Sequence, residues 1–335
     1  MWYHRKLPIP ATWQGKRIRI NFGGVDYEAE IYIDGRSVGY HVGGTVSFTV
    51  DITKFVTPGR EHDLVVRVFD DAHQKTSHQP RGKQCNRYKS CGCSYTRTTG
   101  IWQTVWLEAV DVAGLESCRI VPDFDNGALV FTPTFVSDAA KSLRVTVRDA
   151  KGVPAGKVES KAKSGVSLTV SLSVVRPWSP EDPHLYDILF ETMDKAGRVV
   201  DSVKSYAGLR KVTTEDGWLC LNGKRRYLRF VLDQGFYPDG VWTAPSDAAL
   251  KADIEMSMAA GFNGARLHQK VFEERFHYWA DRLGYLTWGE FASWGADPSS
   301  PEAMRGMIPE WCEVIRRDLN HPSIVAWTPF NETWR

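Results

Sequence analysis

The stretch SDAALKADIEMSMAAGFNGARL, residues 246–267, decides the fold of the last third of the chain. It begins with Ser246, a good helix N-cap, and Gly261 stands where a glycine commonly ends a helix. Between them one helical face carries the apolar residues Leu250, Ile254 and Met258. The short apolar segment 262–267 follows at once and predicts a strand. Alternation of helices with short buried strands is typical of parallel βα units.

The same alternation continues on both sides of this stretch. Apolar segments at 227–232, 285–288 and 324–330 predict further strands, and two helices are predicted between them. The first of these helices carries Phe272, Phe276, Trp279 and Leu283, and the second begins at Ser300 and carries Ile308, Trp311, Cys312, Ile315 and Leu319. We interpret both apolar stripes as core.

Residues 211–335 are therefore predicted to form the first half of a (β/α)8 TIM barrel. Four strands and three helices fill this segment, whereas a closed barrel of eight units takes about 250 residues. The chain ends at Arg335, directly after the fourth predicted strand. We expect either a fragment or an apolar sheet edge that another element covers.

The four predicted strands all end in polar residues. These are Asp233 after the first, Arg266 and His268 after the second, Glu290 after the third, and Asn331 and Glu332 after the fourth. Each of them alone could be a solvated loop residue. Catalytic groups of βα barrels lie at this end of the strands, so we expect the set to open onto one concave face. Its predicted walls are Trp288, Trp294, Trp327 and Trp334.

Upstream of residue 217 the apolar pattern has the period of two that is typical of strands. Short strands separated by glycine, proline and aspartate turns predict a β-sandwich domain at 1–110 and a second one at 111–210. The length and spacing of the second domain fit an immunoglobulin-like sandwich. One large sandwich across both segments is the alternative.

A long basic loop between Asp70 and Thr99 interrupts the first domain, and loops of this length are usually functional or mobile. Its cysteines Cys85, Cys91 and Cys93, with His73 and His78, could bind zinc, but free thiols are preferred because the spacing matches no common zinc motif. Its cations Arg81, Lys83, Arg87, Lys89 and Arg97 could bind nucleic acid, but a solvated loop is the preferred interpretation.

The composition argues against several classes of protein. With 42 basic and 40 acidic residues, the chain offers no strong field for nucleic acid or an anionic membrane. No stretch approaches the apolar length of a membrane helix. The six cysteines form no disulfide framework, so a reducing compartment, the cytoplasm, is the default. The location otherwise stays open, because a truncated start would hide a secretion signal.

Residues 320–332, NHPSIVAWTPFNE, resemble the acid/base signature of glycoside hydrolase family 2, the family of β-galactosidases, β-glucuronidases and β-mannosidases. Asn263–Arg266, followed by Asp281–Leu286, resembles the other signature of that family, and Leu221–Lys224 resembles its barrel entry. Upstream, residues 99–108 resemble the last strand of its sugar-binding jelly roll, and residues 178–186 resemble its immunoglobulin-like module. The resemblance implies a jelly roll at 1–110, an immunoglobulin-like sandwich at 111–210 and half a TIM barrel at 211–335.

The resemblance implies a retaining β-glycosidase for β-galactoside- or β-glucuronide-like substrates, and we expect neither a cofactor nor a metal. Glu332 matches the acid/base, Asn331 the donor to the sugar 2-hydroxyl, and Arg266 a group that orients the nucleophile. Asp233, His268 and Glu290 are assigned to substrate binding. Only Leu267 separates Arg266 from His268, where the family places two small residues.

The nucleophile of the family is a glutamate after the seventh strand, and these residues do not include it. We therefore expect an incomplete chain that is inactive alone. A non-catalytic carbohydrate-binding or assembly module built from the same parts is the alternative. The expected partner is a carbohydrate, with neither nucleic acid nor a membrane involved. Unpaired strand edges near residues 227 and 324 favour self-association, so a homo-oligomer is one expected state.

Overall fold

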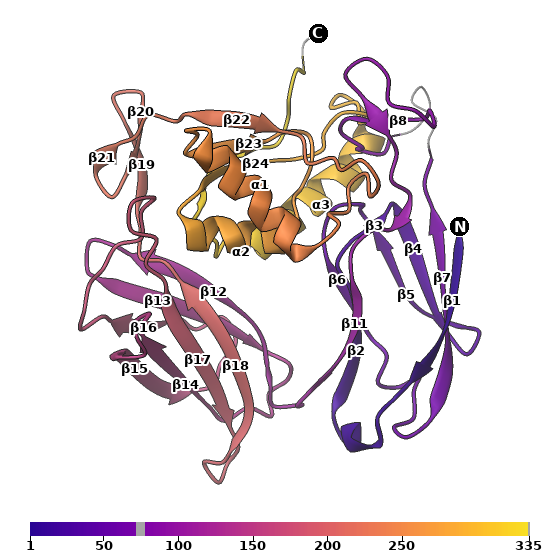
Figure 1. The fold of residues 1–335 in the computed structure, drawn as a ribbon. Helices are drawn as coiled ribbons and strands as arrows, with labels where there is room; N and C mark the ends of the chain where they lie inside the picture. The colour runs from indigo at the N-terminus through magenta and orange to yellow at the C-terminus, as the bar shows by residue number, and fades with distance from the viewer. Residues whose placement is uncertain (72–77, 334–335) are drawn as a thin grey trace.

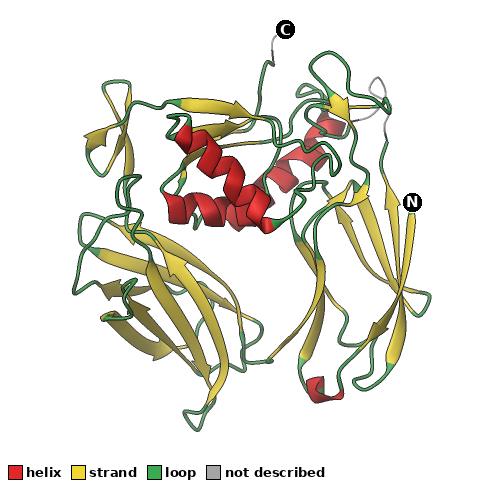
Figure 2. Ribbon diagram, in the orientation of Figure 1, coloured by secondary structure: helices red, strands yellow, loops and turns green. Residues whose placement is uncertain are grey.

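The computed structural model describes residues 1–71 and 78–333. Two β-rich parts are joined by a third part that holds the α-helices and lies against both of them (Figure 1). Strands dominate the chain, and the α-helices of the described residues are confined to the C-terminal third (Figure 2). This division follows the change of apolar period near residue 217.

The first part packs two antiparallel sheets around one apolar core. One sheet has the strand order β1 (Trp2–Pro8), β7 (Glu61–Phe69), β4 (Glu28–Ile33), β5 (Arg36–Val42), and the other has the order β11 (Val105–Val110), β2 (Arg17–Phe22), β6 (Phe48–Asp51). Shorter elements are β3 (Val25–Asp26), β10 (Gly100–Ile101), β8 (Gln84–Cys85), β9 (Tyr95–Thr96) and a 3₁₀ turn at Ala11–Trp13. Asp34 and Gly35 join β4 to β5 in a hairpin turn, with positive φ angles of 48° and 78°.

The second part packs another pair of antiparallel sheets around a core of its own. The strand orders are β12 (Leu115–Asp123), β13 (Ala128–Phe135), β16 (Leu168–Ser171), and β15 (Pro154–Lys161), β14 (Ser142–Arg148), β17 (Tyr186–Met193), β18 (Val199–Ala207). The alternative of one large sandwich is wrong, since the two apolar cores are separate.

The third part begins with a small antiparallel sheet of β19 (Val212–Glu215), β20 (Trp218–Leu221) and β21 (Lys224–Arg225). A parallel sheet follows, in the order β22 (Phe230–Asp233), β23 (Gly264–Leu267), β24 (Leu286–Glu290), β25 (Ile324–Thr328). The helices α1 (Asp247–Ala259), α2 (Glu274–Leu283) and α3 (Pro301–Asp318) connect its strands. The predicted parallel pairing of these segments is confirmed.

Helix caps form where the sequence predicts them. The side chains of Ser246 and Ser300 accept hydrogen bonds from the backbone N–H groups of Ala249 and Ala303, at 3.1 and 3.3 Å. The predicted core stripes are partly wrong: Ile308 is 55% exposed and Met258 is 37% exposed. In α3 the buried face instead holds Ala303, Met307, Glu310, Val314 and Asp318.

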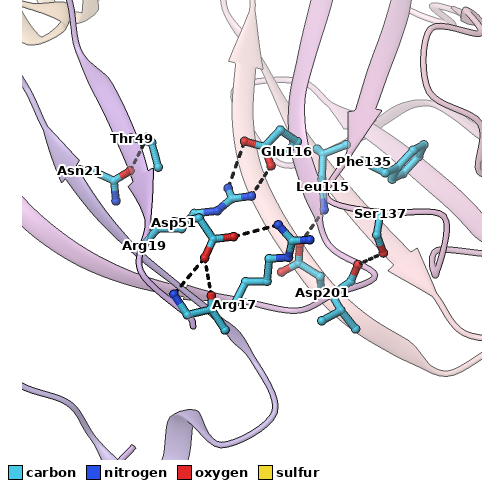
Figure 3. A network of polar contacts seen from close by, with 12 residues as sticks. Arg17, Arg19, Asn21, Thr49, Asp51, Leu115, Glu116, Phe135, Ser137 and Asp201 are labelled. Carbon is cyan, nitrogen blue, oxygen red and sulfur yellow. Dashed lines mark hydrogen bonds and ion pairs between the residues drawn. The ribbon is translucent and has the colours of Figure 1, made fainter. Parts of the chain in front are cut away.

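Polar contacts tie the three parts together. Figure 3 shows Arg19 of β2 donating to both carboxylate oxygens of Glu116 on β12, across the boundary between the first two parts. The indole N–H of Trp178 donates to the backbone oxygen of Asp281 in α2 at 2.7 Å. The carboxylate of Asp281 also accepts a hydrogen bond from Tyr206 at 2.8 Å, so α2 is fixed to the second part.

No helix among the described residues is long and apolar enough to cross a membrane. All six cysteines lie in the described part of the chain and are free thiols there. Within residues 1–71 and 78–333, no group of three His, Cys, Asp or Glu side chains is arranged to hold a metal ion. His73 of the zinc alternative lies outside the described residues.

Candidate active site

The candidate site lies at the carboxyl edge of the parallel sheet, where the side chains of β23, β24 and the segment after β25 meet. Arg266 is the central contact: its Nε donates to Oε2 of Glu290 at 2.6 Å, and its Nη2 donates to Oδ1 of Asn331 at 2.8 Å. Residues 266, 290 and 331 come from three successive βα units. The parallel register brings them together, since Arg266 pairs with Trp288, two residues before Glu290.

Glu290 is a fully buried carboxylate with several partners. Nδ1 of His268 lies 3.0 Å from its Oε1. The same oxygen accepts hydrogen bonds from the backbone N–H and the Nε2 of Gln269, at 3.0 and 3.1 Å. Burial acts to raise the pKa of Glu290, but the contacts with His268 and Arg266 outweigh it and hold the pKa below its ordinary value. Glu290 is therefore an anion that orients its neighbours.

Asn331 presents a donor that the protein leaves unused. Its backbone N–H donates to Oγ of Ser293 at 3.3 Å, and its backbone oxygen accepts from the indole N–H of Trp294 at 3.1 Å. With Oδ1 held by Arg266, the amide orientation is fixed. Its Nδ2 is buried and has no acceptor among the described residues. An amide donor in this state is prepared for a ligand oxygen.

Glu332 follows Asn331 and is exposed, with a positive φ of 53°. Its carboxylate makes no hydrogen bond or ion pair with the part of the chain that the structure describes. Glu332 is thus an exposed residue that directly follows the asparagine with the unused amide.

Asp233 lies apart from this cluster. Its Oδ1 accepts from the backbone N–H of Gly235 at 2.9 Å, and its backbone oxygen accepts from the N–H of His268 at 2.7 Å. Burial raises the pKa of the Asp233 carboxyl above its ordinary value, although Gly235 and Lys270 oppose this shift. Among the described residues, Asp233 is connected to the cluster through the backbone of β23 and of His268.

One predicted wall is wrong. Trp327 pairs with Gly289, so it lies on the helix side of the sheet, where it packs at 5.6 Å against Trp311 of α3. Trp288 and Trp294 do lie near the cluster: Trp288 donates to Thr328 at 2.6 Å, and Trp294 contacts His268 at 6.3 Å between ring centroids. Trp334 lies outside the described residues.

Part of the long loop of the first part also reaches this site. The backbone N–H of Arg81 donates to the oxygen of Trp294 at 2.8 Å, and Tyr95 stacks on Phe236 at 3.9 Å. Arg81 and Lys83 are only 8% and 7% exposed, so their assignment to a solvated loop is wrong. Arg87 and Lys89 are exposed, as a solvated loop requires.

Gln269, Ser293 and the loop residues 81–83 were missed by sequence reasoning. For Gln269 a signal was available: it stands three residues after Arg266, at the position where the family pattern has its histidine. The loop residues carried no such signal, because their contacts with Ala292 and Trp294 span about two hundred residues of chain.

Comparison with known proteins decides the family. The model described as "Glycosyl hydrolases family 2, sugar binding domain" matches residues 1–107, and the model described as "Glycosyl hydrolases family 2" matches residues 114–210. Together these matches cover more than half of the chain. The chain belongs to glycosyl hydrolase family 2.

Individual members of family 2 align along nearly the whole chain. A β-glucuronidase of Paenibacillus borealis is 24% identical over 99% of this chain and 58% of its own length. A β-galactosidase of Bacteroides ovatus is 26% identical over 99% of this chain and 39% of its own length. The crystal structure of a Ruminococcus gnavus β-glucuronidase superposes with a TM-score of 0.85 at 23% identity, covering 99% of this chain and 58% of that one. The chain thus spans about half the length of such relatives, and the structural likeness concerns the fold.

Proposed function

We propose that this chain forms the N-terminal part of a retaining β-glycosidase that cleaves β-galactosides or β-glucuronides. The observation that carries the proposal is the buried, unused Nδ2 of Asn331 at the carboxyl edge of the sheet, directly before the exposed Glu332 in the chain. A sugar bound here would accept a hydrogen bond from Asn331 at its 2-hydroxyl, while Glu332 protonates the leaving oxygen. Relatives named as β-glucuronidase and β-galactosidase support both substrate classes.

In this proposal Arg266 has a positioning role. Its two hydrogen bonds hold Asn331 and Glu290 in fixed orientations. His268 and Glu290 complete this support, and Asp233 bounds the site at the first strand. As the general acid, Glu332 would work opposite a second carboxylate at about 5 to 5.5 Å, the spacing of retaining enzymes.

We further propose that residues 1–110, 111–210 and 211–335 are a jelly roll, an immunoglobulin-like domain and half of a TIM barrel. Leu232 is 50% exposed on β22, although parallel sheets are normally buried on both faces. This supports further chain packing on that side. The nucleophile would come from there, at the end of the seventh strand.

The acid role of Glu332 is tested in the protein that the whole gene encodes. Glu332→Gln should lower the rate of hydrolysis of alkyl β-glycosides by roughly 10²- to 10⁴-fold, because their leaving groups need protonation. The rate of the glycosylation step with dinitrophenyl β-glycosides should be nearly unchanged, because their leaving groups need little protonation. Glu255→Gln on the exposed face of α1 is the matched control. Equal losses of glycosylation rate on both substrate types would remove Glu332 from the acid role.

Retention is tested separately by following the first anomer released, using proton NMR. A β-anomer as the first product supports the double displacement. An α-anomer would contradict it. Residues 1–335 alone are expected to show no turnover, and robust turnover by them would mean that these residues include the nucleophile.

A further inference from the structure

The long loop of the first part holds two thiols side by side. Sγ of Cys91 donates a weak hydrogen bond to Sγ of Cys85, with 4.0 Å between the two sulfur atoms. Sγ of Cys85 donates in turn to the backbone oxygen of Arg87, also at 4.0 Å. The sulfur atoms of a disulfide are about 2.05 Å apart, so a shift of about 2 Å brings these two thiols to bonding distance.

Backbone pairing on both sides maintains this approach. Cys85 lies on β8, is 4% exposed, and pairs in register with Thr96 of β9. Cys91 and Ser94 exchange two backbone hydrogen bonds, at 2.9 and 3.0 Å. The hydroxyl of Thr96 also donates to the backbone oxygen of Arg87 at 2.8 Å. The exposed turn that carries Cys91 can therefore move toward Cys85 while β8 keeps its contacts.

The two thiols differ in their access to solvent. Cys91 is half-buried and Cys85 is buried, so a reagent reaches Cys91 first. Cys93 is exposed in the same turn, but its sulfur forms no hydrogen bond with either of these thiols. One accessible thiol beside one buried thiol is the arrangement that thiol–disulfide exchange in two steps requires.

The loop around the pair is basic. Residues 78–99 contain five lysines and arginines and neither aspartate nor glutamate. Arg87 and Lys89 are exposed between the two cysteines, and the guanidinium of Arg97 lies 5.6 Å from the centroid of the Tyr88 ring. This charge attracts anionic reagents. Among small disulfides, oxidised glutathione is anionic, because it carries more carboxylates than ammonium groups.

We propose that Cys85 and Cys91 form a reversible disulfide and that oxidised glutathione is the oxidant. The thiolate of Cys91 attacks one sulfur of oxidised glutathione and releases a first molecule of reduced glutathione. The thiolate of Cys85 then attacks Sγ of Cys91, which forms the protein disulfide and releases a second. The two thiol protons pass through solvent to the two glutathione thiolates. The two cysteines are oxidised, and the disulfide bond of glutathione is reduced.

The disulfide closes residues 85–91 into a ring beside the candidate site. The base of the same loop is docked there: the N–H of Gly82 donates to the oxygen of Ala292 at 3.1 Å. Gly82 has a φ of +60°, and a Cβ there would lie 2.0 Å from the backbone oxygen of Gln269. Only glycine permits this approach. Oxidation thus restrains the exposed end of a loop whose base contacts the turns after β23 and β24, and this inference does not depend on the glycosidase activity proposed above.

The test uses the protein that the whole gene encodes, first reduced and then incubated with oxidised glutathione. Free thiols are blocked, and the disulfides of tryptic peptides are identified by tandem mass spectrometry. We expect the 85–91 disulfide in roughly tenfold excess over the 85–93 and 91–93 disulfides, because Cys85 and Cys91 are already in contact. Dithiothreitol should restore both thiols.

Cys93→Ser is the matched control, because it removes an exposed thiol of the same turn. It should leave the yield of the 85–91 disulfide unchanged, whereas Cys91→Ser should leave the buried Cys85 reduced. Lys89→Gln tests the choice of oxidant. It should lower the rate with oxidised glutathione by roughly two- to threefold, without lowering the rate with cystamine, a cationic disulfide.

The proposal is overturned if folded protein, verified by its melting curve, forms no 85–91 disulfide with oxidised glutathione. A main product that joins Cys93 to either of the other two cysteines would overturn it as well. If Lys89→Gln changes neither rate, or lowers both rates equally, the assignment of an anionic oxidant is wrong.

Discussion

Glu290 shows how a buried anion organises the candidate site at the scale of single residues. Its two oxygens accept hydrogen bonds from Arg266 and Gln269, and Nδ1 of His268 lies 3.0 Å from one of them. Since the pKa of Glu290 lies below its ordinary value, ionised Glu290 stabilises the fold at pH values above the unfolded-state pKa of about 4.5. That contribution is lost as the pH falls through the folded-state pKa.

Replacing Arg266 by methionine should reverse this dependence. Glu290 would stay buried with fewer partners, so its pKa would rise and its ionised form would destabilise the fold. We expect a loss of about 2 to 3 kcal/mol at pH 7 and a smaller loss at pH 4, from denaturant unfolding at both pH values. Arg275→Met, which breaks the exposed pair with Asp247, should cost less than about 1 kcal/mol. A loss independent of pH would contradict this account.

Some residue positions were predictable and others were not. Arg266, Glu290 and Asn331 could be placed together, because parallel strands bring their carboxyl ends to one edge. The misplacement of Trp327 was avoidable, since side chains alternate between the two faces of a strand. The contacts of the loop residues 81–83 with Ala292 and Trp294 could not be predicted, because a contact between distant loops leaves no periodic pattern in either segment.

At the scale of elements, α3 docks on the first part through a buried carboxylate. Oε1 of Glu310 accepts hydrogen bonds from the backbone N–H and the hydroxyl of Thr45, at 2.9 and 2.6 Å. Its Oε2 is buried and has no partner among the described residues. Burial outweighs the bonds from Thr45 and raises the pKa of Glu310 to about 7. The folded protein therefore favours the protonated form of the Glu310 carboxyl.

The contribution of Glu310 to stability therefore changes with pH in the opposite direction from that of Glu290. Because the folded-state pKa of Glu310 is raised, its contribution to stability is complete below pH 4.5. This contribution is lost as the pH rises through about 7. Glu310→Gln should remove this loss and make the protein more stable at pH 8, by roughly 3 kcal/mol. Thermal unfolding between pH 4.5 and 8 measures it. Glu302→Gln, exposed on the same helix, should leave this pH window unchanged, and a variant less stable at pH 8 would contradict the assignment.

The same helix explains why its buried face was predicted wrongly. Periodicity placed Ile308, Trp311 and Ile315 in the core, but Glu310 and Asp318 occupy buried positions and Ile308 is largely exposed. Asp318 is held there by Arg317, at 2.6 and 2.7 Å. Apolar patterning finds a helix and its caps, but it cannot identify a face that is buried through hydrogen bonds and ion pairs.

At the scale of the whole molecule, apolar clusters join the third part to each of the other two, whereas the contact between the first two parts includes an ion pair. Arg19 forms this pair with Glu116, and its side chain is 10% exposed while Glu116 is 38% exposed (Figure 3). The sequence predicted both parts but not their mutual position. The apolar pattern of the strands predicts which face of each sheet is buried. It does not predict which other part of the molecule lies against the end of the sandwich.

Arg19→Met should therefore weaken the junction between the first two parts. We expect a loss of about 1 to 2 kcal/mol in thermal or denaturant unfolding, since Arg19 is nearly buried and Glu116 would lose its partner. Arg17→Met is the control. Arg17 pairs with Asp51 on the surface, where the two side chains are 40% and 39% exposed, so this substitution should change the free energy of unfolding little. Equal effects of the two substitutions would show that the junction does not depend on Arg19.

The docking of Gly82 against Gln269 also limits how such proteins can be recombined. In a chimera that joins the first part of one relative to the βα part of another, a residue larger than glycine at position 82 would collide with the backbone after β23. The donor and recipient must therefore match at this loop as well as at the linker. Exchange of the first part alone should therefore produce proteins in which this loop does not dock against the turn after β23.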